Sequence, residues 1–527
     1  MLPAGGRTLH RDVAAFPFHP VLAAAYPVLF LFATNAAEQV NLDPLWVPLG
    51  LAVIGVVLTL SVLGILLRDW PRAGLLTLVL VIGFFGYGHA WNAVSGVLGS
   101  QWPFIVGWVV ALAIGLALAW RSRQAARRLT PALNLMAVVL VAVNVWTVAS
   151  AMVAVAAVEP PAEVASVQLQ PPDPDDLPDV YYIILDRYAG PTALRQTYDF
   201  DNEPFLAQLE SRGFAVARHA HANYIKTPLS LGSSLNIDFL DADALEAQAR
   251  DGADREPIHR VLGDHLVVPD ALKELGYSYI HVSNWWTPTV TNIDADRTFH
   301  YEGQDEFSTV LAQTTFLRAF NEPEAAPTDP WDWRVLRRHT LYELEKLEEI
   351  PSLPGPKYVF AHLLIPHDPY VFNADGTFTG RAQVAQLGDL ESYRRQLEYA
   401  NRRILGIIDR IVASDPGAVI MLQGDEGPFP ERYQADEWGF EWREATTEEL
   451  EQKFNILFAM RVPDTDVAAA GFHDDITPVN AFRVIFNARF GADLPLLPDR
   501  TWAHQDLDHF YDFFEITDRL DHGSPSG

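Results

Sequence analysis

Five long apolar runs occupy the first 158 residues, and this feature constrains the fold more than any other. Each run approaches the roughly 20 residues that an α-helix needs to cross the hydrocarbon core of a bilayer. Because a backbone in lipid must satisfy its own polar groups, these runs predict a five-helix transmembrane bundle in residues 1–158. The predicted spans are residues 20–37, 45–67, 75–99, 102–120 and 132–158.

The arginines of this half predict how the bundle is oriented. They precede the first span, follow the second and follow the fourth, at Arg7, Arg11, Arg68, Arg72, Arg121, Arg123, Arg127 and Arg128. The alternate loops carry acidic residues or no charge. By the positive-inside rule the N-terminus is cytoplasmic and the fifth span delivers the rest of the chain to the outside of the plasma (inner) membrane.

Charge separates the two halves of the chain. Residues 1–158 have a formal net charge of +4. Because the whole chain has a net charge of −29, residues 159–527 carry −33. So acidic a soluble part lacks the clustered Lys and Arg that nucleic acid requires, which excludes nucleic acid as a partner. The chain has no Cys, which excludes disulfides, thiolate nucleophiles and zinc-thiolate sites. Residues 159–179 are rich in Pro and predict a semi-rigid linker.

Residues 180–527 alternate β-rich runs with helical patterns, which is typical of a mostly parallel sheet covered on both faces. The predicted strands are residues 180–185, 277–282, 358–364, 418–423 and 454–460. The predicted helices include residues 203–212, 269–275, 390–412 and 478–489.

Charged side chains and imidazoles follow several of these strands. Asp186 and Arg187 come directly after the first strand, His367 follows the third, and Asp425 and Glu426 follow the fourth. Because ligands bind beyond the carboxyl ends of strands in open α/β sheets, we expect these groups to collect at one edge. Each alone is more often a turn or cap residue; together they suggest a metal site.

Thr227 precedes Pro228, which is favoured at the first helical position, so Thr227 is the expected N-cap of a helix. The unpaired amides and the dipole at such a helix start attract anions. An ordinary helix cap is the alternative interpretation. His362 lies inside a predicted strand and is interpreted as a packed core histidine.

Three segments carry a resemblance to a known family: Pro178 to Asp186, His362 to Tyr370, and Gly424-Asp-Glu-Gly427, with Thr227 between the first two. In this order they resemble the alkaline-phosphatase superfamily, in particular its sulfatase-like branch, which includes lipoteichoic acid synthases and phosphoethanolamine transferases. The resemblance covers most of residues 178–490 and implies an alkaline-phosphatase-like α/β domain.

The resemblance also implies roles for individual residues. Thr227 matches the nucleophile, and His367 matches a residue that contacts the substrate or protonates the leaving group. The implied metal ligands are Asp186, Thr227, Asp425 and Glu426. The implied substrate-binding residues are Arg187, Lys226 and His367.

Two departures from the family pattern matter. Glu426 stands where most relatives have His, so the implied ligand set is all oxygen and favours Mn, Mg or Ca over Zn. Arg187 stands where sulfatases often have a second Asp, which argues for one metal ion. Sulfatases also require a Cys or Ser that is oxidised to formylglycine, and Thr227 cannot be oxidised in this way.

The sequence therefore predicts a membrane-anchored, metal-dependent hydrolase or transferase. Its expected substrates are phosphate-type, or else sulfate-type, esters of lipids or envelope glycans at the outer face of the plasma membrane. A pseudoenzyme that keeps the fold as a binding or scaffold protein is the alternative, because Glu426 alters the usual motif. A transporter is disfavoured, because the spans show neither repeat symmetry nor clustered charges.

Overall fold

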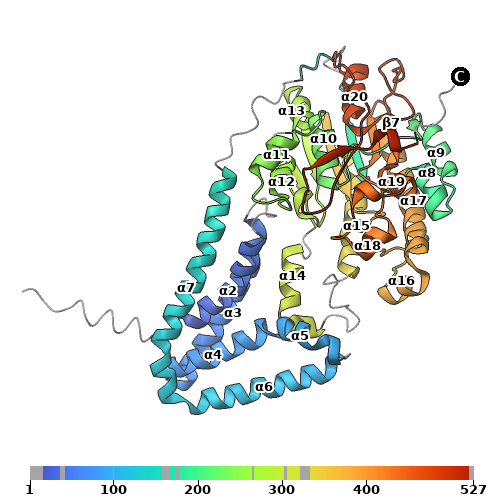
Figure 1. The fold of residues 1–527 in the computed structure, drawn as a ribbon. Coiled ribbons are helices and arrows are strands. Elements are labelled where there is room, and N and C mark those ends of the chain that lie inside the picture. Colours follow the sequence, from blue (N-terminus) through green and yellow to red (C-terminus); the bar gives the residue numbers. More distant parts are fainter. Residues whose placement is uncertain are drawn as a thin grey trace, which may run out of the picture. The chain divides into compact units, whose positions relative to one another are not determined.

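The computed structural model describes residues 16–35, 42–98, 100–156, 167–171, 177–263, 266–301, 306–320 and 333–521. The chain forms two compact units (Figure 1). The membrane unit comprises residues 1–158 and 304–332, and the α/β unit comprises residues 159–303 and 333–527. Most of the predicted linker lies outside the described residues.

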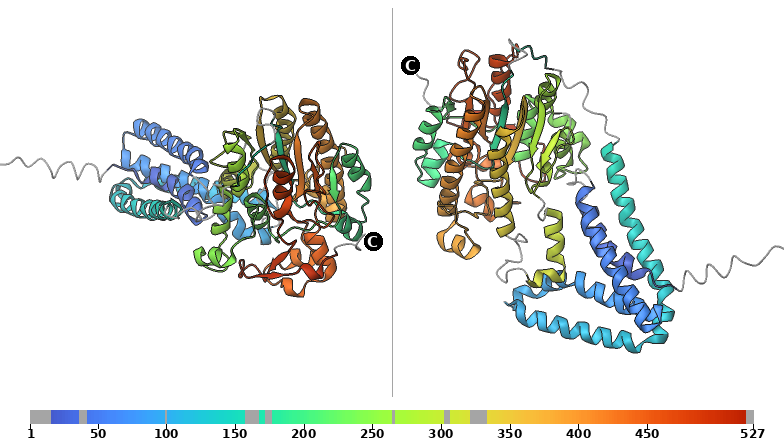
Figure 2. Two further views of the ribbon diagram at one scale, coloured as in Figure 1. Left: turned by 90° about the horizontal axis from the view of Figure 1, so that it is seen from above. Right: turned by 180° about the vertical axis from the view of Figure 1, so that it is seen from behind.

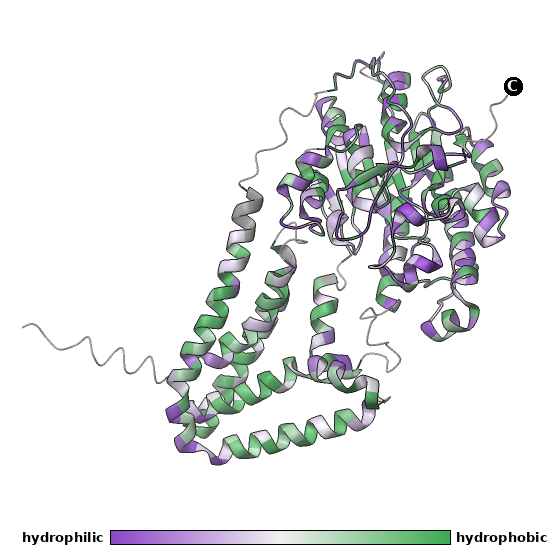
Figure 3. Ribbon diagram, in the orientation of Figure 1, coloured by the Kyte–Doolittle hydropathy of each residue, from purple (hydrophilic) through white to green (hydrophobic). Residues whose placement is uncertain are grey.

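The membrane unit is built from apolar helices, which stand out by their hydrophobic colouring in Figure 3. They are α2 His19–Thr34, α3 Asp43–Leu67, α4 Trp70–Phe85, α5 Tyr87–Leu98, α6 Gln101–Arg121 and α7 Arg123–Ala156. Three helices are long and apolar enough to cross a membrane: α3, α6 and α7. Helices α4 and α5 form a pair bent by 46°, which raises the number of spans to four if the pair counts as one.

The predicted count of five spans is therefore not confirmed. The first predicted span corresponds to α2, whose 16 residues are fewer than a straight crossing needs; residues 36–37 lie outside the described part of the chain. The third predicted span is interrupted, because helix α4 ends at Phe85 and α5 begins only at Tyr87. Apolar composition alone does not reveal such a break.

The α/β unit contains a seven-stranded sheet in the order β2-β7-β6-β1-β5-β3-β4. Its strands are β1 Val180–Leu185, β2 Ala215–Ala217, β3 Ser278–Val282, β4 Arg297–Phe299, β5 Lys357–Leu363, β6 Val419–Gly424 and β7 Phe458–Arg461. Strands β6, β1, β5, β3 and β4 are parallel, and β7 pairs antiparallel with β6 and β2. The predicted α/β domain with a mostly parallel sheet is confirmed.

Alternate residues of the central strand β1 enter two hydrophobic cores. Tyr182 and Ile184 belong to one core, and Tyr181 and Ile183 to the other. This division explains why β1 is a continuous apolar run, since both faces of the sheet are covered by helices (Figure 2). Helix α20 Ala481–Arg489 packs on the first core and α17 Asp389–Ser414 on the second.

The remaining elements of this unit lie around the sheet and helices α17 and α20. The helices are α8 Pro191–Tyr198, α9 Glu203–Glu210, α10 Thr227–Asn236, α11 Ala242–Gln248, α12 Glu256–Gly263, α13 Val267–Glu274, α15 Trp333–Glu349, α16 Arg381–Leu387, α18 Glu431–Ala435 and α19 Thr447–Phe454. Strands β8 Trp502–His504 and β9 Phe513–Glu515 form a separate antiparallel pair. Because α19 continues to Phe454, the last predicted strand starts four residues later than expected.

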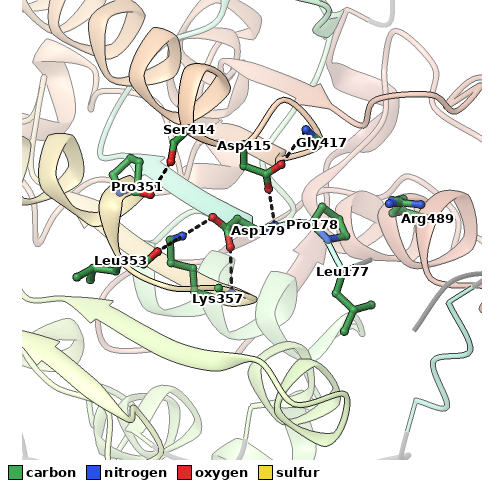
Figure 4. A pocket seen from close by; sticks show the side chains of 11 residues that line it. Leu177, Pro178, Asp179, Pro351, Leu353, Lys357, Ser414, Asp415, Gly417 and Arg489 are labelled. Atoms are coloured by element: carbon green, nitrogen blue, oxygen red, sulfur yellow. Dashed lines mark hydrogen bonds and ion pairs between the residues drawn. The ribbon is translucent and has the colours of Figure 1, made fainter. Parts of the chain in front are cut away.

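A polar cavity of about 350 Å³ lies at the amino ends of β1 and β5 (Figure 4). The buried Lys357 ammonium donates to Leu353 O at 3.1 Å and is also paired with the Asp179 carboxylate. Asp415 accepts from the amides of Asp179 at 2.8 Å and Gly417 at 2.9 Å. Since the charged groups of this cavity are already paired with groups of the protein, we interpret the cavity as a structural feature that holds the start of β1 in place.

His473 provides a pH-dependent contact in the loop that follows β7. Its Nε2 lies 2.7 Å from Asp499 Oδ2, and Asp499 also accepts from the Thr477 amide at 2.7 Å. The hydrogen bond to Asp499 raises the pKa of His473 to about 9, although burial opposes it.

Because the folded pKa lies above the ordinary value near 6.5, the stabilisation is fully present below about pH 6.5 and is lost as pH rises through about 9. We expect His473→Gln to lower the unfolding temperature of the α/β unit at pH 6 but much less at pH 10. Thermal unfolding of both proteins across this range checks the sign, and a difference that grows with pH would contradict it.

Candidate active site

Three buried side chains meet at the carboxyl ends of neighbouring strands. Asp186 follows β1, Asp425 follows β6, and His362 is the penultimate residue of β5. Their ligand atoms lie within 4.8 Å of one another, and His362 Nε2 is 3.2 Å from Asp186 Oδ2. The strand register explains the meeting, because Leu185 pairs with Gly424 and Ile184 pairs with His362.

The other ring nitrogen of His362 is fixed by its surroundings. Nδ1 lies 2.9 Å from Thr289 Oγ1, and the Asn284 side-chain amide donates to both Thr289 Oγ1 and His362 O at 2.8 Å. Such contacts set the orientation of a ligating imidazole. Here they leave Nε2 directed at Asp186.

The two carboxylates of this group have strongly different environments. Burial alone would raise the pKa of Asp186, but His367, His362 and Arg187 together lower it to about 2. Burial raises the pKa of Asp425 well above its ordinary value, and the neighbouring charges of Asp186 and Glu426 raise it further. A cation bound beside them would favour the ionised form of both carboxyl groups.

Carboxylate oxygens without a hydrogen-bond partner also indicate a cation site. Asp186 Oδ1 and Asp425 Oδ2 are buried and accept no hydrogen bond from any described residue. Buried polar atoms almost always have a partner. Two carboxylates and an imidazole are typical ligands of a divalent cation, so these residues fit a metal ion.

Thr227 lies beside this group. It is the first residue of α10 and is buried, and its hydroxyl lies close enough to Asp425 to lower the pKa of that carboxyl group. The N-cap residue is Lys226, in extended conformation, and not Thr227 as the sequence suggested. Pro228 therefore occupies the second helical position.

Arg187 joins the site through both its backbone and its side chain. Its amide donates to Asp425 Oδ1 at 3.0 Å, and its φ of 57° lies in the left-handed region, which costs energy for a residue with a Cβ. Its guanidinium pairs with Asp368. The His367 ring lies edge-on to Trp285, with ring centroids 6.4 Å apart.

Three cations surround the ring of Phe429. Lys453 Nζ lies 3.3 Å, Lys226 Nζ 4.2 Å and Arg187 Cζ 4.7 Å from its centroid. Burial lowers the pKa of Lys226 to about 7 and that of Lys453 to about 8. Concentrated positive charge beside Thr227 suits an anionic ligand.

Glu426 is not part of the three-residue group. Its Oε1 lies 2.8 Å from Lys453 Nζ and 3.6 Å from Arg187 Nε, so its carboxylate already has an internal cation. The sequence analysis missed Lys453 because a lysine in an amphipathic helix gives no signal. It also set His362 aside as a core residue, although a histidine within a strand that neighbours β1 was a usable signal.

Comparison with known proteins gives no match by sequence. No family model and no curated protein sequence matches the chain. Among solved structures, the chain is similar to the C-terminal periplasmic domain of EcEptC from Escherichia coli, in complex with Zn, at 13% identity and a TM-score of 0.43. That match covers 68% of this chain and 97% of the other.

Two further solved structures are similar at about the same level. The integral membrane lipooligosaccharide phosphoethanolamine transferase A from Neisseria meningitidis is 12% identical, with a TM-score of 0.38, covering 89% of this chain and 94% of the other. The lipoteichoic acid synthase LtaP from Listeria monocytogenes is 12% identical, with a TM-score of 0.36, covering 65% and 82%.

Proposed function

We propose that the α/β unit is a phosphotransferase or phosphodiesterase that uses Thr227 as its nucleophile. The observation that carries the proposal is the Thr227 hydroxyl at a helix start, against Asp425 in a buried group of two carboxylates and one imidazole. Asp186, His362 and Asp425 would hold one divalent cation. When bound, the cation would lower the pKa of the threonine hydroxyl and draw charge from the phosphate.

The protein residues have separate roles in the proposed reaction. The Thr227 hydroxyl gives up its proton to solvent, and its oxygen forms a bond to phosphorus while the bond from phosphorus to the leaving oxygen breaks. His367 donates a proton to that oxygen. Water or an acceptor hydroxyl then displaces Thr227, which decides between hydrolysis and transfer. Lys226 and Arg187 stabilise the charge that develops on the other phosphate oxygens.

The identity of the metal ion depends on which residues bind it. If His362 binds the metal and Glu426 does not, the ligands are no longer the all-oxygen set that the sequence analysis expected. Mixed nitrogen and oxygen ligands suit zinc or manganese better than calcium or magnesium. We therefore propose that zinc and manganese bind more tightly than the other two.

A membrane unit on the same chain supports a membrane-associated ester as the substrate, on a lipid or an envelope glycan. The test is turnover by the full chain in phospholipid nanodiscs, with lipid phosphodiesters and aryl sulfates supplied in turn with each of the four metals. Cleavage of phosphodiesters with a metal requirement supports the proposal. A protein that binds the metal but turns over neither class would support the scaffold alternative.

Location at the outer face of the plasma membrane is a separate proposal, which rests on the arginine-rich loops. The chain has no Cys, so single-Cys labelling reports topology directly. We expect Ser166→Cys to react with an impermeant thiol reagent in intact cells and Ser122→Cys to react only after lysis. The reverse pattern would overturn the orientation.

A further inference from the structure

Part of the chain returns from the α/β unit to the membrane unit. Residues 304–332 belong to the membrane unit, although the chain before and after them belongs to the α/β unit. The described part contains α14 Glu306–Thr314 and the short 3-10 helix η2 Phe316–Phe320. Figure 1 shows α14 among the helices of the membrane unit. The two units are therefore connected by three crossings of the chain.

Helix α14 packs against one end of the bundle. Phe307 and Leu311 share a hydrophobic cluster with Phe32 near the end of α2, Leu45 near the start of α3 and Val148 late in α7. The rings of Phe307 and Phe32 meet edge to face, with centroids 5.6 Å apart. By chain direction, these helix ends lie on the side of the membrane where α7 leads out to the α/β unit.

The contact with α5 is close and specific. A Cβ added at Gly88 would lie 2.1 Å from Gln313 O and 2.6 Å from Thr314 Cα, so only glycine permits this backbone approach. In η2, Phe316 packs on Tyr87 with ring centroids 5.0 Å apart. Arg318 donates to the Asn92 side chain at 2.7 Å.

The exposure pattern of η2 is the reverse of that of a water-facing helix. Leu317 is 47% exposed and Phe320 is 78% exposed, whereas the one charged residue, Arg318, is only 7% exposed. Neighbouring parts of the unit also expose apolar side chains, including Val97 at the end of α5 and Trp102 at the start of α6. Exposed apolar surface that continues the surface of membrane helices fits lipid.

We propose that the turn Phe316–Phe320 inserts into the lipid leaflet on the side of the α/β unit, with Leu317 and Phe320 in contact with phospholipid at the boundary between headgroups and acyl chains. Phe and Leu are among the residues with which interfacial helices enter this boundary. The turn would anchor the α/β unit to the bilayer at a point separate from residues 159–179. The proposal does not depend on the chemistry of the candidate active site.

The test uses the full chain in phosphatidylcholine and phosphatidylglycerol nanodiscs, with a nitroxide on Phe320→Cys or, separately, Leu317→Cys. Collision with oxygen, which concentrates in lipid, is compared with collision with a water-soluble nickel complex. Trp146→Cys in α7, 76% exposed, is the lipid reference, and Trp438→Cys in the α/β unit, 63% exposed, is the aqueous reference.

We expect the ratio of oxygen to nickel accessibility at 320 and 317 to exceed that at 438 several-fold and to stay below that at 146, which lies near the middle of the fifth predicted span. A ratio like that at 438 would place the turn in water. Inaccessibility to both reagents would place it under protein, such as a second copy of the chain. Either result would overturn the proposal, and because both positions are already exposed, the labels should not disturb the fold.

Discussion

Replacing Thr227 by alanine is expected to abolish ester turnover, with a loss on the order of 10³-fold or more, as for other enzymes that lose their nucleophile. The physical reason is the position of the hydroxyl, at the first residue of α10 and against Asp425. Turnover of a lipid phosphodiester by the full chain measures the effect.

Stability should change little in this variant. Loss of an N-cap side chain costs roughly 0.5–2 kcal/mol. The N-cap of α10 is Lys226 and not Thr227, so this cost does not apply to the Thr227→Ala variant, and the loss of stability should fall below that range. An inactive but equally stable Thr227→Ala protein would separate catalysis from folding.

Thr227→Ser is the matched control, because it keeps a hydroxyl at the same position and should retain measurable turnover. Intact-mass analysis after brief exposure to a competent donor adds a direct readout. An adduct that maps to Thr227 supports the nucleophile, whereas full activity in the alanine variant would reject the proposed mechanism.

The sequence predicts the fold well because its central strands are short apolar runs bounded by turns. β1 matches its predicted limits, and β3, β5 and β6 lie within one residue of theirs. The start of β7 was predicted less accurately, because the apolar residues at the end of α19 continue directly into this strand. Whether β7 pairs parallel or antiparallel depends on long-range contacts that local patterning does not encode.

The candidate site was predictable only in part, because some of its contacts join residues that are far apart in the sequence. Asp186 and Asp425 follow strands, and their meeting follows from a general rule about parallel sheets. His362 enters the group from within β5, because it aligns with Ile184 of β1 and so lies only two positions before the level of Asp186. The partner of Glu426 is Lys453, and only the packing of α19 brings it there. Local sequence shows neither relation.

The second prediction with a large effect tests whether His362 or Glu426 binds the metal. We expect His362→Gln to weaken metal binding by more than about 100-fold, since even loss of a supporting contact to a ligand costs 10–100-fold. Glu426→Gln should bind the metal nearly as well as the wild type, because its Oε1 lies 2.8 Å from Lys453 and outside the three-residue group. Equilibrium dialysis with zinc and manganese measures both.

We expect Glu426→Gln, which should affect metal binding less than His362→Gln, to lower the stability of the protein more. Glu426→Gln leaves the Lys453 ammonium buried without its carboxylate, and breaking a buried ion pair costs roughly 3–5 kcal/mol. The cost is reduced where Lys453 can lose its proton, since burial already lowers its pKa to about 8. The double variant Glu426→Gln with Lys453→Met removes both charges and should recover much of the stability.

The double variant also keeps the test decisive if Glu426→Gln fails to fold. A folded double variant that binds metal with wild-type affinity assigns the site to Asp186, His362 and Asp425. Metal affinity that falls as far in the double variant as in His362→Gln would return Glu426 to the ligand set. In that case Lys453 would be the group that the bound metal displaces, and the preference for oxygen-binding metals expected from the sequence would be restored.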